Sequence, residues 1–170
     1  MPGTPTLRTV LVEYAALEHV IQGLLNRYGY TCCSRCENVC CRYDICEEST
    51  VSAFLTLLRA LYPPEADYDE KYGWHTADGC ALRTGRPPVC YEFFCDDWLA
   101  AQASDAVRQA IKALGMLLTQ VGRRALGQRH LVTMSDPLLL SRVSPERLMK
   151  KIQRAREELE RLEAILHDAE

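Results

Sequence analysis

The chain has 170 residues, of which 48% are hydrophobic, and its formal net charge is -3. A chain of this size buries an ordinary core without disulfides to compensate for a small interior. Its Lys and Arg residues are spread along the sequence rather than gathered in a block. The composition therefore argues against a nucleic-acid partner and against a polybasic patch for membranes.

The N-terminal segment predicts an amphipathic helix over about residues 5–27. Apolar residues recur there mostly at steps of three and four: Leu7, Val10, Leu11, Tyr14, Val20, Ile21, Leu24 and Leu25. Charged residues such as Arg8, Glu13 and Glu18 interrupt the segment, so it lacks the unbroken apolar centre of a signal peptide or membrane span. We therefore expect a cytoplasmic protein that does not enter a membrane.

Six of the nine cysteines lie within residues 31–46, in the stretch TCCSRCENVCCRYDIC. In a reducing cytosol such a cluster is typical of metal binding or catalysis rather than of a disulfide framework, and an odd total fits pairing poorly. We expect a loop here, followed by a helix over residues 51–61 that ends at Pro63-Pro64. Residues 63–95 carry three more cysteines among many Gly and Pro residues, which predicts a second irregular cysteine loop.

Two helices are expected in the C-terminal part of the chain. The first begins at Asp96 or Asp97 and ends near Gly127, with an apolar stripe at regular spacing: Val107, Ile111, Leu114, Leu118, Val121 and Ala125. Residues 130–134 are interpreted as coil. The last helix begins at Ser144-Pro145 and has a heptad-like seam: Leu148, Ile152, Ala155, Leu159, Leu162 and Leu166.

These elements predict a mostly α-helical bundle in one domain, residues 1–170, with two irregular cysteine-rich loops that bind metal. Residues 30–95 would form the cysteine-rich metal-binding core and residues 96–170 a C-terminal helical hairpin. We favour the hairpin because residues 128–143 give the chain room to reverse. The seam is also compatible with a homodimer or with a protein partner bound through the C-terminal helices.

Several cysteines have the spacing of metal ligands. Cys33 and Cys36 form a Cys-x-x-Cys pair, in which two thiolates converge from one turn, as in zinc knuckles and iron–sulfur loops. Cys40 and Cys41 follow, and the second loop adds three more: Cys80, Cys90 and Cys95. Because adjacent cysteines point in different directions, Cys40 and Cys41 suit a cluster or two metals better than one ion. One of them is equally compatible with a buried, inert thiol.

The stretches CSRCENVCC (33–41) and CALRTGRPPVC (80–90) resemble a family of small bacterial zinc- or iron-chelating proteins. That family is named for a Cys-x-x-Cys-x-x-Cys-Cys signature and is related to flagellin lysine methylases; its later element has a cysteine, an Arg-Pro pair and a second cysteine. The resemblance implies that Arg86 and Pro87 shape the second loop. It also implies an iron–sulfur cluster or Zn²⁺ held by six cysteines: Cys33, Cys36, Cys40, Cys41, Cys80 and Cys90.

The chain departs from the family pattern at two points. Three residues separate Cys36 from Cys40 where the family usually has two, so Cys32 competes with Cys33 as the first ligand. The cysteine often found before the second element is absent, and His75 lies near its place; a neutral imidazole can replace a thiolate on zinc or iron. Cys46 and Cys95 are further candidates.

The sequence thus predicts a metal-binding protein with a cysteine-ligated iron–sulfur cluster or zinc. Metal ligation is expected to help order the two loops, which have little apolar surface of their own. Two alternatives stay open: a metal-dependent methyl-transfer or redox enzyme, and a protein-interaction module with a structural metal. No glycine-rich turn typical of a methyl-donor pocket is present, so enzymatic activity is undecided.

Overall fold

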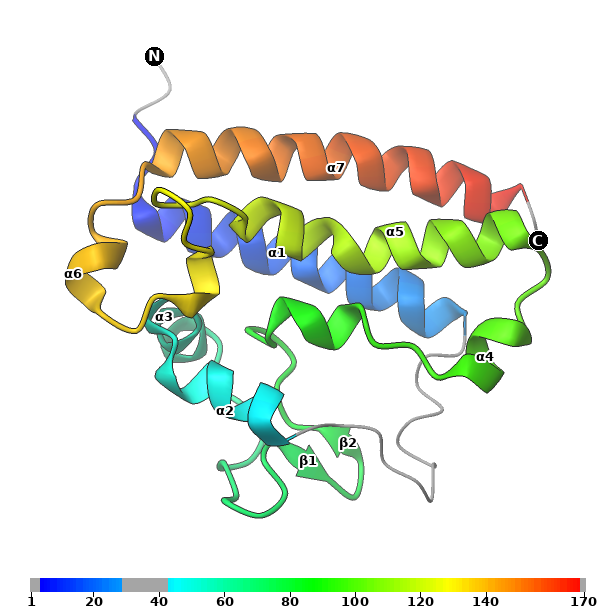
Figure 1. Ribbon diagram of the computed structural model, residues 1–170, viewed down its shortest axis with the longest axis horizontal. Helices are drawn as coiled ribbons and strands as arrows, with labels where there is room; N and C mark the ends of the chain where they lie inside the picture. Colours follow the sequence, from blue (N-terminus) through cyan, green and yellow to red (C-terminus); the bar gives the residue numbers. More distant parts are fainter. Residues whose placement is uncertain (1–3, 29–42, 169–170) are drawn as a thin grey trace.

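The computed structural model describes residues 4–28 and 43–168, and the chain is mostly α-helical, as the sequence predicts (Figure 1). One antiparallel hairpin of two short strands pairs His75 with Cys80 and Thr76 with Gly79. The elements in chain order are α1 (Leu7–Arg27), α2 (Tyr43–Val51), α3 (Ala53–Leu61), β1 (His75–Thr76), β2 (Gly79–Cys80), the 3-10 helix η2 (Pro88–Tyr91), α4 (Asp96–Ala100), α5 (Asp105–Gly122), the 3-10 helix η3 (Leu131–Thr133), α6 (Pro137–Leu140) and α7 (Pro145–His167).

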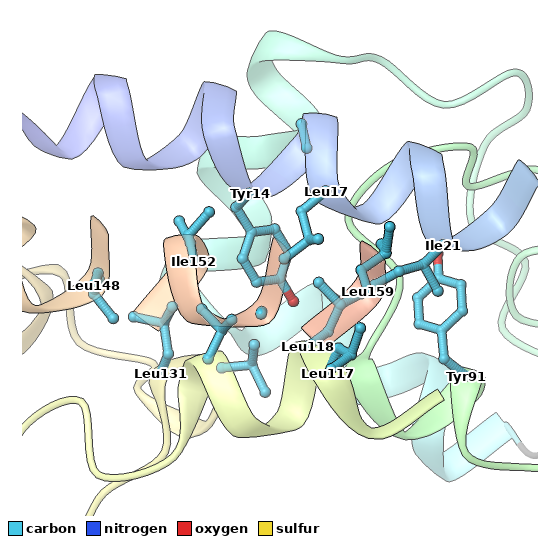
Figure 2. Packing of buried hydrophobic residues seen from close by; sticks show 14 of the residues in the cluster. Tyr14, Leu17, Ile21, Tyr91, Leu117, Leu118, Leu131, Leu148, Ile152 and Leu159 are labelled. Carbon is cyan, nitrogen blue, oxygen red and sulfur yellow. The ribbon is translucent and has the colours of Figure 1, made fainter. Parts of the chain in front are cut away.

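Three long helices, α1, α5 and α7, run side by side and enclose the main core (Figure 1). Figure 2 shows Tyr14, Leu17 and Ile21 of α1 among apolar side chains from α5 and α7. All three are essentially inaccessible to solvent. The shorter elements α2, α3 and the hairpin lie below this layer in Figure 1 and carry the described cysteines of both segments except Cys90 and Cys95.

Helix α1 matches its predicted range closely. Thr6 caps its N-terminus by accepting a hydrogen bond from the Thr9 backbone, and the Thr9 side chain accepts one from the Thr6 backbone in return. The apolar stripe is narrower than predicted because Val20, counted in it, is 46% exposed. Glu18 lies on the buried face instead.

The seam of α7 is covered within the chain. Ser144 caps the helix and Pro145 occupies its first turn, as predicted, and all six seam residues are buried against α1 and α5. Arg156 of α7 also donates to Glu13 of α1 across 2.5 Å. The apolar surface that the sequence left open to a dimer partner is therefore occupied by the chain itself.

Two predicted helices are each divided by a serine that caps a new helix. The helix expected over residues 51–61 is α3, which Ser52 caps, and a separate α2 precedes it, so Cys46 is helical rather than in a loop. The helix expected from Asp96 to Gly127 is wrong as one element. Ser104 accepts a hydrogen bond from the Val107 backbone and starts α5, which ends at Gly122.

The segment 63–95 is less irregular than predicted. It contains the β1–β2 hairpin and η2, and residues 131–133, interpreted as coil, form η3. Asp69 accepts hydrogen bonds from the Lys71 and Tyr72 backbones, which fixes the turn before the hairpin. None of the helices in the described part of the chain combines the length and apolar character that a membrane crossing requires.

His130 holds η3 against the end of α5 and should make stability depend on pH. Its Nδ1 accepts from the Val132 backbone at 3.3 Å, and its Nε2 lies 2.9 Å from the Thr119 carbonyl, which fits a neutral ring. Burial is the main reason why the pKa of His130 lies below 6.5, helped by the charges of Lys151 and Arg123 and opposed by the Thr119 hydrogen bond and by Glu92.

Because the unfolded chain binds this proton more readily, stability should fall as pH drops below about 6.5 and level off below the lowered pKa. We expect His130→Gln to lose less free energy of unfolding than the wild type between pH 7.5 and pH 5. Urea unfolding at both pH values measures this difference. Identical losses in the two proteins would show that His130 does not couple folding to protons.

Candidate metal centre

Helix α2 and the β1–β2 hairpin meet at Trp74, which is 6% exposed. Its indole Nε1 donates to Ser49 Oγ across 2.7 Å, and Ser49 Oγ donates to the Cys46 carbonyl across 2.6 Å. Tyr68 packs edge-on against the ring with centroids 5.2 Å apart, and the Arg59 guanidinium lies 5.7 Å from the ring centre. This contact fixes the hairpin on the helix that carries Cys46.

Cys46 and Cys80 are brought together at this junction. Both thiols pack against one small apolar cluster formed by Trp74, Ala81 and Leu82. Burial raises the pKa of the Cys46 thiol, the hydrogen bond from the Trp74 backbone N–H lowers it, and the neighbouring Cys80 raises it again. A cysteine from the first sequence cluster thus lies beside one from the second.

The segment from Cys80 to Tyr91 makes a turn next to Gly85. Gly85 has φ of +80°, a conformation that an L side chain rarely adopts, and its Cα faces Leu58 of α3. Arg86 Nε donates to the Leu82 carbonyl across 2.6 Å, so its side chain folds toward the strand that carries Cys80. Pro87 precedes η2, which carries Cys90.

Two side chains of α1, four positions apart, form hydrogen bonds to the segment between Cys80 and Tyr91. Glu18, completely buried, accepts from the Gly85 N–H at 2.8 Å, the Arg86 N–H at 3.0 Å and the Tyr91 hydroxyl at 2.7 Å. Gln22 Nε2 donates to the Arg83 carbonyl at 2.7 Å and to the Tyr91 hydroxyl at 2.5 Å. The second cysteine segment is therefore anchored on α1 at several points.

The anchor combines a buried carboxylate with a partly buried guanidinium. Burial raises the pKa of Glu18 above its usual value, and its three hydrogen bonds and the charge of Arg86 offset only part of that rise. Every polar contact is a donor aimed at the carboxylate, so the arrangement suits its ionised form. Burial lowers the pKa of Arg86, yet the net pKa is raised because four acidic groups face it: Tyr91, Cys80, Glu18 and Cys90.

Of the other candidate ligands, two lie within the described residues, His75 and Cys95. His75 is paired directly with Cys80 across the hairpin, and directly opposite residues of antiparallel strands share a face. Cys95 is exposed at the N-cap of α4. Five predicted ligands lie outside the described residues: Cys32, Cys33, Cys36, Cys40 and Cys41. Within the described ranges no group of three or more His, Cys, Asp or Glu side chains is arranged to hold a metal ion.

In comparisons with known proteins, no family model matches the sequence, and no curated protein or solved structure is significantly similar to it. Only the residues of this chain therefore indicate its function. Three cysteines, Cys46, Cys80 and Cys90, each interact electrostatically with Arg86, and Cys46 also interacts with Cys80.

Glu18 and Gln22 were not predicted from the sequence as parts of the candidate site. A usable signal was present, because Leu11, Tyr14, Glu18, Ile21 and Leu25 follow one another at steps of three and four. A carboxylate within an apolar stripe is costly to bury unless donors meet it. The donors lie 67 to 73 positions away in sequence. The local pattern therefore indicates that Glu18 needs hydrogen-bond donors, but it does not indicate which residues supply them.

Proposed function

We propose that this protein binds a metal centre through thiolates of its two cysteine segments, as an iron–sulfur cluster or as zinc. The observation that carries the proposal is the contact between the surroundings of Cys46 and Cys80, which belong to different segments. Thiolate is the ligand that zinc and iron–sulfur clusters share. The remaining ligands would come from Cys90 and from the cysteines at positions 32–41.

The electrostatics of the anchored turn also support this proposal. A centre ligated by several thiolates carries excess negative charge, and Arg86 places a positive charge beside Cys80 and Cys90. The fixed backbone around Cys80 would limit the entropy lost when metal binds.

Anaerobic purification followed by metal analysis, sulfide analysis and visible absorption tests the proposal directly. Bound iron and sulfide with a brown colour identify a cluster, and colourless protein with stoichiometric zinc identifies a zinc site. Protein that binds neither, even after reconstitution under reducing conditions, would refute the proposed function.

Replacing a ligand should separate the thiols that bind metal from those that do not. We expect Cys80→Ser to weaken zinc binding at least about 10-fold, since changes even in residues around a metal's ligands cost that much. Cys95→Ser is the comparison, because Cys95 is exposed outside the turn. Competition with a chromophoric zinc chelator measures both affinities. Equal affinity in Cys80→Ser and wild type would remove Cys80 from the centre.

A further inference from the structure

We infer that Glu18 is a positioning residue of the metal centre: it docks the second cysteine segment on α1, so that half of the site is formed before metal arrives. The inference depends on the proposed function, since it concerns the same centre. Glu18 itself is fully buried and is not a candidate ligand. Its effect on metal would be exerted through the backbone that it holds.

The geometry of the carboxylate explains why this position needs a glutamate. One oxygen accepts from the Gly85 N–H, and the other accepts from both the Arg86 N–H and the Tyr91 hydroxyl. Glutamine would offer one acceptor oxygen and place an amide N–H against a donor. At least one backbone N–H would then lose its partner, which is costly in a buried site.

The contacts lie between the two cysteines of the second segment. Gly85 and Arg86 stand five and six positions after Cys80, and Tyr91 directly follows Cys90. Glu18 thus holds the middle and the end of the turn at once, which sets how far apart Cys80 and Cys90 lie. Gln22 adds a third point by holding the Arg83 carbonyl.

Helix α1 also leads directly into the first cysteine segment. It ends at Arg27, and Cys32 follows five residues later in the sequence. One helix is therefore covalently continuous with the first segment and hydrogen-bonded to the second. The cost of burying a carboxylate makes sense at a point where a rigid helix holds the backbone between Cys80 and Cys90.

Glu18→Gln is the decisive variant, and Glu13→Gln is its matched control. Glu13 lies on the same helix, and its ion pair with Arg156 holds α7, not the cysteine segment. Both variants remove a carboxylate by which α1 contacts another part of the chain. A purely structural role for Glu18 would therefore make the two variants alike in metal binding.

Two measurements on the full chain test the inference. In metal-free wild-type protein we expect the amides of Gly85 and Arg86 to be protected from hydrogen exchange, and Glu18→Gln to lose that protection while Glu13→Gln keeps it. By chelator competition, Glu18→Gln should bind zinc at least about 10-fold more weakly than wild type, and Glu13→Gln with wild-type affinity.

Tyr91→Phe provides a milder variant if Glu18→Gln fails to fold, because it removes one donor and keeps the ring. We expect an affinity for zinc below that of wild type. If Glu18→Gln binds zinc with wild-type affinity, the inference is overturned and the proposed metal centre is not. If Glu18→Gln does not fold, wild-type zinc affinity in Tyr91→Phe has the same meaning. Absence of metal from the wild type itself would overturn the proposed function as well.

Discussion

Gly115→Ala should destabilise the protein by about 3 kcal/mol, because a Cβ at this position has no space. It would overlap the Tyr91 carbonyl oxygen and lie 3.0 Å from Phe94 Cζ. The main obstacle is backbone, so relief requires η2 to move away from α5. That movement would also pull the Tyr91 hydroxyl from Glu18.

Gly23→Ala is the matched control, since the same substitution in helix α1 meets nothing within 4 Å. We expect it to stabilise the protein by roughly 0.5 to 1 kcal/mol through helix propensity alone. Urea unfolding followed by circular dichroism measures both changes. A Gly115→Ala protein as stable as wild type would show that η2 does not pack on α5 as closely as described.

Trp74→Ala should detach the β1–β2 hairpin from α2, at a cost of about 3 to 5 kcal/mol for that contact. The indole fills the small apolar cluster at the junction and donates to Ser49. This cluster is separate from the main core. The loss should therefore appear as faster hydrogen exchange in residues 65–82, with the exchange of α1, α5 and α7 nearly unchanged.

Two further variants divide this effect into its parts. Trp74→Phe keeps most of the apolar contact and loses the hydrogen bond to Ser49, so about 1 to 3 kcal/mol of the effect should remain. Tyr72→Ala removes an aromatic ring from the same loop, but Tyr72 is 47% exposed and should matter little. A uniform increase in hydrogen exchange over all helices of Trp74→Ala would contradict the prediction that only the hairpin detaches.

Long helices were predictable because their signals are local. The stripes of α1 and α7 and the cap at Ser144 can be read from neighbouring residues, and the structure confirms them. The division at Ser104 left a weaker signal. Apolar spacing begins only at Val107, and the Ser104-Asp105 pair before it is typical of a helix start.

The site was less predictable because its decisive contacts join distant positions. Trp74 is buried, but nothing local in the sequence indicated its hydrogen bond to Ser49, 25 positions earlier. The role of Glu18 was hidden for the same reason. The ligand roles of Cys46, Cys80 and Cys90 remain predictions that metal analysis will test.

The ion pair between Glu13 and Arg156 spans 143 positions, which bears on the order of events during translation. At about 5 to 20 residues per second, Arg156 is synthesised roughly 7 to 29 seconds after Glu13. The contacts of Glu18, by contrast, need nothing beyond Tyr91. A ribosome-bound chain can therefore assemble the contacts between α1 and the second cysteine segment before α7 covers the apolar face of α1.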